Sequence, residues 1–127
     1  MKKAWFSIIS LGLIVTGCNN DDLDMPVISA CDVKNPIENL EWLGAEVEKR
    51  KNNTSEDALY CYIEQATAGN ETIFIYNDCN PLINKVLPIY DCSGNSVGLL
   101  GDENFATNTI TKRTIIFKPS NFKCQID

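Results

Sequence analysis

The chain contains no histidine among its 127 residues, and this absence removes several kinds of active site at once. A Ser-His-Asp triad and a Cys-His dyad both need an imidazole to activate the nucleophile. Zinc sites commonly use histidine or closely spaced cysteine pairs, and the sequence has no Cys-x-x-Cys spacing. We therefore expect no metal site and no cofactor, and we do not expect an enzyme.

Acidic residues leave two further chemistries open. Glycoside hydrolysis needs only two carboxylates, and the candidates are Glu64, Glu71, Asp102 and Glu103. Nothing in the sequence fixes any two of them at a working separation. Residues 102–104 (Asp-Glu-Asn) could bind calcium, but they lack the alternating oxygen ligands of a calcium loop, so an ordinary polar loop is favoured.

The sequence also lacks an apolar run long enough to cross a bilayer. Residues 4–15 are apolar, which is shorter than the roughly 20 residues that a membrane span needs. They follow Met1, Lys2 and Lys3 and lead into Val-Thr-Gly-Cys at 15–18, the pattern of a lipoprotein signal peptide covering residues 1–17. Cys18 would then carry diacylglycerol and an acyl (palmitate) chain, which together anchor a protein stably in a membrane. Cleavage by an ordinary signal peptidase, which would leave Cys18 as a spare thiol, is the alternative.

Basic residues are few, so the chain is acidic. It has 11 Lys and Arg against 17 Asp and Glu, a net charge of −6. Loss of residues 1–17 removes two basic residues and no acidic ones, which leaves 9 − 17 = −8. Such a surface repels nucleic acid, so we expect no nucleic-acid partner. A polar tether, residues 18–30, then leads to a single domain, residues 31–127.

The tether and the domain both carry a resemblance. The tether begins NNDDLD, with Asp21, Asp22 and Asp24, and resembles Bacteroidota lipoproteins in which such an acidic patch marks export to the cell surface. The domain segments NPIENLEWL (35–43), CNPLINKVLPIYDCSGNSVGLLGD (79–102) and IIFKPSNFKC (115–124) resemble a family of small Bacteroidota lipoproteins with no assigned activity. The resemblance implies a lipid-anchored outer-membrane protein on the cell surface, with the periplasmic face as the alternative. It supplies no catalytic residue.

Cysteines are numerous for a domain of this size, and five remain after Cys18: Cys31, Cys61, Cys79, Cys92 and Cys124. In an oxidising compartment they should form disulfides. Because five is odd, we expect at most two intramolecular disulfides and one thiol that is free, buried or bonded to another chain. The sequence leaves the pairing open.

The start of the domain predicts a helix. Asn35 can cap it, Pro36 suits the first helical position, and Glu38 can complete a capping box. Apolar residues then recur at helical spacing, at Ile37, Leu40, Leu43 and Val47, over about four turns ending near residues 52–53. Trp42 flanks this stripe and is predicted to pack against a sheet.

After residue 55 the apolar period changes to two and predicts strands. Aliphatic and aromatic residues alternate in a hairpin whose loop is placed at residues 68–70. A register that keeps the aliphatic residues on one face puts Tyr62 beside Phe74 and Tyr60 beside Tyr76. Further strands are predicted at 85–91, where Pro88 suggests an edge or bulge, at 97–100 and at 109–118. The fold class is α+β, with one N-terminal amphipathic helix packed on a disulfide-stapled antiparallel β-meander of four to five strands.

This arrangement suggests a function for the aromatic face of the hairpin. If the helix covers the aliphatic face, Tyr60, Tyr62, Phe74 and Tyr76 face outward and form a possible binding face for a protein or glycan partner. The domain would then be a surface-displayed binding or interaction module. The alternatives are that the fifth strand or C-terminal tail covers these rings, that the protein is a structural subunit of an envelope assembly joined through its odd cysteine, or that it inhibits secreted proteases.

Overall fold

The computed structural model describes residues 29–82 and 84–126, so the signal peptide, Cys18 and the acidic residues Asp21, Asp22 and Asp24 lie outside the described residues. Two helical segments, α1 (Pro36–Asn39) and α2 (Glu41–Lys51), follow the short strands β1 (Ser29–Ala30) and β2 (Val33–Lys34). The remaining strands are β3 (Cys61–Ala68), β4 (Glu71–Asp78), β5 (Pro88–Tyr90), β6 (Ser96–Leu99) and β7 (Ile110–Phe117), and the 3-10 turns η1 (Asp57–Tyr60) and η2 (Thr107–Thr109) precede β3 and β7. No helix in this described part is long and apolar enough to cross a membrane.

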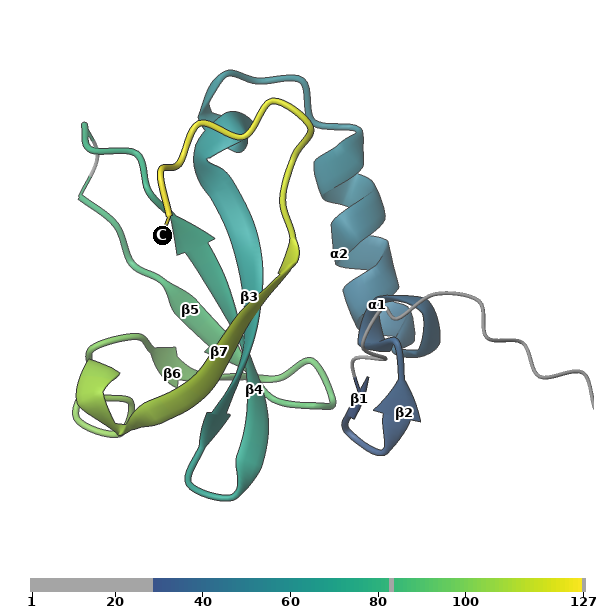
Figure 1. The fold of residues 1–127 in the computed structure, drawn as a ribbon, viewed down its shortest axis with the longest axis vertical. Coiled ribbons are helices and arrows are strands. Elements are labelled where there is room, and N and C mark those ends of the chain that lie inside the picture. Colours follow the sequence, from purple (N-terminus) through teal and green to yellow (C-terminus); the bar gives the residue numbers. More distant parts are fainter. Residues whose placement is uncertain (1–28, 83, 127) are drawn as a thin grey trace, which may run out of the picture.

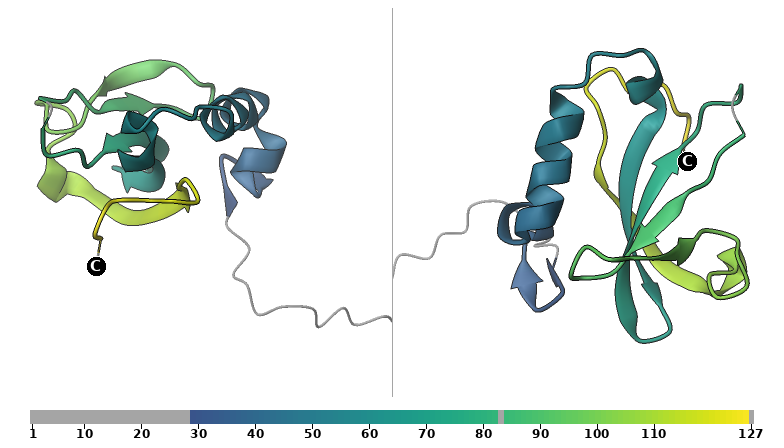
Figure 2. Two further views of the ribbon diagram at one scale, coloured as in Figure 1. Left: turned by 90° about the horizontal axis from the view of Figure 1, so that it is seen from above. Right: turned by 180° about the vertical axis from the view of Figure 1, so that it is seen from behind.

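The five longer strands form one antiparallel sheet in the order β6-β5-β4-β3-β7. Strands β3 to β6 are a meander, whereas β7 returns to pair with β3 at the other edge. Helix α2 lies along one side of the coiled sheet, and the C-terminal segment passes beside the ends of β3 and β4 (Figures 1 and 2). The predicted α+β class is therefore confirmed.

The helical region is interrupted at Leu40, which the sequence did not predict. Leu40 is extended, with φ −104° and ψ 109°, and its N–H bonds to the Pro36 carbonyl, so α1 ends after one turn. Asn35 lies at φ 48° and its side chain makes no capping bond, so the predicted side-chain cap was wrong. The break lets α1 fold back on α2, where a Cβ on Gly44 would lie 2.8 Å from the Ile37 carbonyl oxygen. Glycine is required there by close approach of the backbone.

One core lies between α2 and the sheet face that we call the helix face. Leu43 and Val47 of α2 pack with Ile63 of β3 and Phe74 of β4, and all four are 0–3% exposed. Trp42 meets the edge of Phe74 at a ring separation of 5.5 Å, and its indole N–H donates to the Cys92 carbonyl over 2.9 Å. The prediction that Trp42 packs against a sheet is confirmed.

The register between β3 and β4 differs from the predicted one. A two-residue loop, Gly69–Asn70, pairs Ala68 with Glu71, so Phe74 lies opposite Gln65 and Tyr76 lies opposite Ile63. The predicted three-residue loop would have paired even-numbered residues of β3 with even-numbered residues of β4, and odd-numbered with odd-numbered. Because a shift of one residue moves a whole strand's side chains to the other face, the aromatic residues of β4 lie under the helix.

The opposite face, which we call the tail face, carries the second core. It is formed by the buried side chains of Ala66, Ile73, Ile75, Ile89 and Ile110. Phe105 and Leu100, from the connection between β6 and β7, pack against it. The aliphatic residues of β4 are therefore buried beneath this connection instead of beneath the helix.

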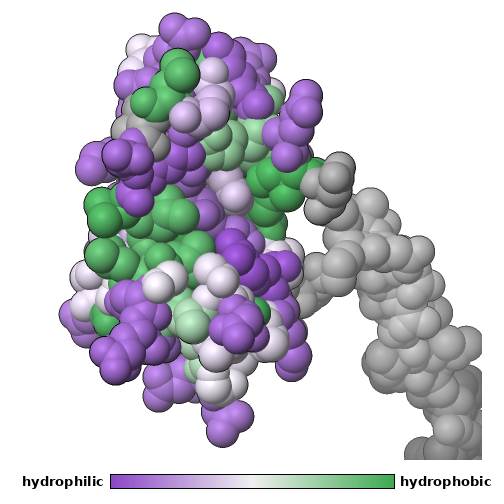
Figure 3. All heavy atoms as spheres, turned by 90° about the vertical axis from the view of Figure 1, so that its left-hand side faces the viewer, coloured by the Kyte–Doolittle hydropathy of each residue, from purple (hydrophilic) through white to green (hydrophobic). Residues whose placement is uncertain are grey.

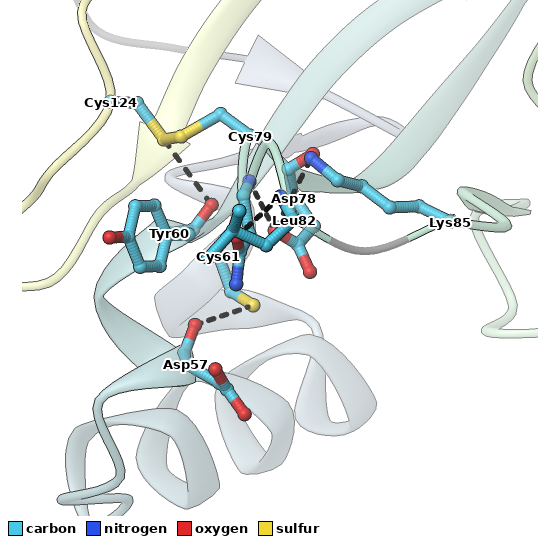
Figure 4. The surroundings of a disulfide bond; sticks show 9 residues. Asp57, Tyr60, Cys61, Asp78, Cys79, Leu82, Lys85 and Cys124 are labelled. Atoms are coloured by element: carbon cyan, nitrogen blue, oxygen red, sulfur yellow. Dashed lines mark hydrogen bonds and ion pairs between the residues drawn. A yellow bond between two sulfur atoms is a disulfide. The ribbon is translucent and has the colours of Figure 1, made fainter.

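Two disulfides join the N-terminal segment and the C-terminal tail of the domain to the sheet and its turns. Cys31–Cys92 ties the N-terminal segment to the β5–β6 turn, and Cys79–Cys124 ties the end of β4 to the C-terminal tail. Cys61 is the unpaired thiol among the described cysteines, and its sulfur points away from the Cys79–Cys124 bond towards Asp57 (Figure 4). The sequence predicted at most two intramolecular disulfides and one odd thiol, and the two disulfides and the unpaired Cys61 agree with this prediction. Ala30 is 7% exposed within the core, so the folded unit already includes Ser29–Ala30, which the sequence had assigned to the tether.

We expect removal of the tail disulfide to destabilise the domain. The double variant Cys79→Ser/Cys124→Ser should lose about 2–4 kcal/mol of unfolding free energy, because the bond restricts the unfolded chain. Cys61→Ser is the matched control and should change stability little, since its thiol bonds only to the Asp57 carbonyl in the described structure. Urea denaturation measures both. Equal losses for the double variant and the control would contradict the assignment.

Candidate functional site

The four aromatic residues predicted as a binding face are not brought together. Phe74 is fully buried under α2, and Tyr76 packs on Tyr90 at 4.2 Å beneath the guanidinium of Arg50. Tyr62 lies on the tail face, where its ring makes a T-shaped contact with the ring of Phe122 in the tail, at a centroid separation of 5.4 Å. Tyr60 lies in η1, beside Lys123. The predicted aromatic face was therefore wrong, because the β3–β4 register separates the rings and the helix and tail cover them.

An ion pair on the tail face, between the buried Glu64 and the one-third-exposed Arg113, is the strongest candidate for a site. The Glu64 side chain, 9% exposed in the middle of β3, accepts bonds from Arg113 Nε at 3.0 Å and Nη2 at 2.7 Å. The Asn77 amide, on the neighbouring strand β4, also donates to Glu64. A buried ion pair is costly to form, and an apolar pair of similar volume is often as stable, so this pair is weak evidence for a stabilising role.

An irregularity in β7 aims Arg113 at Glu64. Opposite Ala66, strand β7 has two residues, Lys112 and Arg113, so the strand is bulged there. Lys112 has φ 53°, a left-handed conformation that is uncommon for a residue other than glycine. Bulges and such strained residues recur next to functional sites, where they redirect a side chain. Here the redirected side chain is that of Arg113.

The ion pair faces a hollow of about 390 Å³. Its lining residues are Tyr62, Glu64, Arg113, Ile115 and Ile126. A second irregularity in β7, between Ile115 and Phe117, places Ile115 opposite Glu64. Ile126 is 45% exposed and belongs to the tail that Cys124 fixes to Cys79. The hollow has a polar floor and aliphatic walls, and its size falls within the roughly 300–1,000 Å³ of small-molecule sites.

The electrostatics of the hollow are balanced. Burial, together with the nearby Glu64 carboxylate, raises the pKa of Tyr62, so its hydroxyl is neutral at physiological pH. The bond to Glu64 raises the pKa of Arg113, so the guanidinium stays charged and paired. A guanidinium has five N–H donors, and Glu64 uses two of them, on Nε and Nη2. Arg113 is one-third exposed, so its remaining donors can serve a ligand.

The other acidic candidates from the sequence do not join Glu64. Glu71 begins β4 at a separate hollow, beside Asp91 and the Cys31–Cys92 bond. Asp102 accepts the N–H groups of Leu99, Asn104 and Phe105, so it stabilises its own loop. Within residues 29–82 and 84–126, no group of three or more acidic or cysteine side chains could hold a metal ion.

Arg113 and Asn77 were missed by the sequence analysis. The alternation in β3 correctly placed Tyr62 and Glu64 on one face, and a buried carboxylate there requires a cationic partner. The two basic residues of β7, Lys112 and Arg113, were the available signal. Which of the two reaches Glu64 depends on the bulge, and the residue pattern does not reveal a bulge.

An exposed apolar surface was also a candidate, and it lies elsewhere. Leu82 and Val86 of the β4–β5 connection are 89% and 72% exposed, and Val97 and Leu99 of β6 are about 40% exposed. Apolar side chains gather on this side of the molecule (Figure 3). The outer edge of β6 is closed at Leu99, because Asp102 both accepts from its N–H and donates to its carbonyl. This closure hinders addition of a partner strand at Leu99.

Comparison with protein-family models, curated proteins and solved structures finds no match for this chain. The chemistry of the site therefore has to be argued from its own residues.

A double-mutant cycle can measure the Glu64–Arg113 coupling. Arg113→Leu should cost about 3 kcal/mol of unfolding free energy, at the low end of the range because Arg113 is one-third exposed. In a Glu64→Gln background the same change should cost about 1 kcal/mol or less, since no buried charge is left unpaired. Urea denaturation of the four proteins gives both values. The same loss in both backgrounds would show that the pair is not coupled.

Proposed function

We propose that this protein is a membrane-anchored envelope lipoprotein, of the small Bacteroidota surface lipoprotein type, that binds a ligand in the hollow above Glu64 and Arg113. Cys18 is the proposed lipidation site, and Asp21, Asp22 and Asp24 are the proposed export signal. The domain is proposed to be displayed on the cell surface and to act as a binding module without catalysis of its own.

The single observation that carries the proposed binding role is the Glu64–Arg113 ion pair, which lies beside the bulge in β7. Bulges are common in edge strands such as β7, and here the bulge, with Lys112 at φ 53°, leaves the Arg113 side chain bonded to Glu64. The same side chains form the floor of a hollow, and Phe122 and the Cys79–Cys124 bond hold its rim. Preorganised polar groups in a largely formed hollow are typical of ligand sites.

Two features support the envelope location. The signal-peptide pattern ends at Cys18, and two disulfides staple the domain, as is usual in oxidising compartments. A domain of about one hundred residues buries only around two-thirds of its unfolded surface, so such staples add to its stability.

Lipidation can be tested directly at Cys18. Cells expressing the wild-type chain should incorporate labelled palmitate into the protein and retain it in the outer-membrane fraction. Cys18→Ala should abolish the label and release the protein from that fraction, whereas Cys61→Ser, the matched control, should retain both. Palmitate incorporation into the Cys18→Ala protein would contradict the proposal. Protease accessibility on intact cells then distinguishes the cell surface from the periplasmic face.

Ligand binding can be tested by photocrosslinking in native cells. A benzoylphenylalanine at position 126, on the rim of the hollow, should give a specific adduct. The same group at position 86 is the matched control, because Val86 is also an exposed aliphatic residue but lies on the β4–β5 connection. Mass spectrometry identifies the adducts.

An adduct at position 126 that disappears with Arg113→Leu supports binding in the hollow, provided the variant is folded by its melting transition. Equal adducts at positions 126 and 86, or none at 126, would contradict it. A mixed disulfide through Cys61 on non-reducing gels would instead favour the structural-subunit alternative.

A further inference from the structure

We propose that the ligand of the Glu64–Arg113 hollow is a neutral polyol, namely a glycan residue with adjacent hydroxyl groups. This inference rests on the proposed binding function and names the chemical class that the hollow accepts. It follows from the charge, the hydrogen-bonding groups and the walls of the hollow.

The charge balance disfavours an ionic ligand. Glu64 and Arg113 neutralise each other through two short bonds, and the other lining side chains are uncharged or aliphatic. A free anion would have to compete with Glu64 for the guanidinium and approach a mature chain of net charge 9 − 17 = −8. A cation would gain little from the Glu64 carboxylate, because Arg113 already neutralises its charge. The hollow therefore favours a ligand without net charge.

The hydrogen-bonding groups disfavour a purely apolar ligand. Covering Arg113 with hydrocarbon would desolvate the N–H groups that Glu64 leaves free, and buried donors without partners are costly. Those donors need acceptors, the Tyr62 hydroxyl can donate or accept, and Glu64 Oε2, which accepts one bond from Arg113, retains accepting capacity. A hydroxyl group both donates and accepts. Two neighbouring hydroxyls can therefore bridge the guanidinium and the carboxylate, which are held side by side.

The walls fit the C–H surface of a sugar ring. Ile115 and Ile126 supply aliphatic surface, and Tyr62 supplies an aromatic ring. Phe122 packs edge-on against that ring at 5.4 Å and fixes its orientation before a ligand arrives. The polar residues that line the hollow, Tyr62, Glu64 and Arg113, offer side-chain hydroxyl, carboxylate and guanidinium groups, whereas extended peptides are held mainly by backbone bonds at a sheet edge. A glycan thus offers hydroxyl groups for the polar side chains at the floor and C–H surface for the apolar side chains at the walls.

The test uses the mature lipidated protein in nanodiscs and sugars of the same ring type that are neutral, anionic or cationic. Surface plasmon resonance would compare N-acetylglucosamine and glucose, which are neutral, with glucuronate, an anion, and glucosamine, a cation; neutral oligosaccharides of glucose, mannose and N-acetylglucosamine extend the series. We expect millimolar binding of at least one neutral sugar, and at least ten-fold weaker binding of the charged analogue of the same ring.

Matched variants locate the binding in the hollow. Arg113→Lys keeps the charge but loses the planar fork, so neutral-sugar binding should fall at least ten-fold. Ile126→Ala changes only the exposed rim, leaves the ion pair intact and should weaken binding a few-fold. Val86→Ala, on the β4–β5 connection, should leave binding unchanged. If Arg113→Lys fails to fold, Ile126→Ala against Val86→Ala still decides the location.

The possible failures are distinguishable. Binding of glucuronate or phosphate in preference to neutral sugars overturns the polyol assignment and leaves the binding function standing. A peptide or protein adduct at position 126 without sugar binding does the same. The absence of both sugar binding and a specific adduct at position 126 overturns the polyol assignment and the binding function together.

Discussion

The pairing of β3 with β4 is the constraint on which the rest of the domain depends. A loop of two residues, with Gly69 at φ 63°, makes Ala68 face Glu71 and so fixes which side chain of β4 lies beside each side chain of β3. Gly69 can adopt this conformation without the steric cost that a side chain would add. From this register it follows that Ile63 and Phe74 lie under the helix, while Glu64, Asn77 and Ile75 lie on the tail face. Both cores and the ion pair are consequences of one tight turn.

The two disulfides fix the N-terminal segment and the C-terminal tail, which have few backbone hydrogen bonds to the sheet. Among the described residues, the tail is bonded to the rest of the domain through the Lys123 N–H, which donates to the Leu59 carbonyl, and the Cys79–Cys124 bond lies next to it. Ile126, which follows this attachment, lines the hollow, and Phe122, which precedes it, packs against the lining residue Tyr62. The site therefore depends on a covalent bond at some distance from its polar floor. Cys61 pairs with Asp78, so Cys79, the next residue after Asp78, points to the opposite face, which keeps the odd thiol away from this bond.

The sequence predicted those features that depend on local patterns. Helical spacing located Trp42, Leu43 and Val47, and period-two alternation located the strands, because burial of one face imposes these periods directly. The features that failed depend on single residues: Leu40 breaks the helix, and one residue fewer in the hairpin loop reverses the faces of β4. Arg113 was hidden for the same reason, since a bulge of one residue decides whether Lys112 or Arg113 faces Glu64. Spacing arguments cannot detect an insertion of one residue in a ladder.

The placement of the charged pair favours the proposed binding role of the site over a purely structural one. The tail face already holds a continuous aliphatic core at Ala66, Ile73, Ile75 and Ile89, and an apolar side chain at position 64 would have extended it. Instead, Glu64 interrupts this core, requires Arg113 and Asn77 as partners, and is accompanied by an unfavourable backbone conformation at Lys112. Each of these features has an energetic cost that a purely structural strand would avoid. Together they provide a fixed pattern of donors and acceptors that lines a hollow, and recognition of a polar ligand is the use that we propose for it.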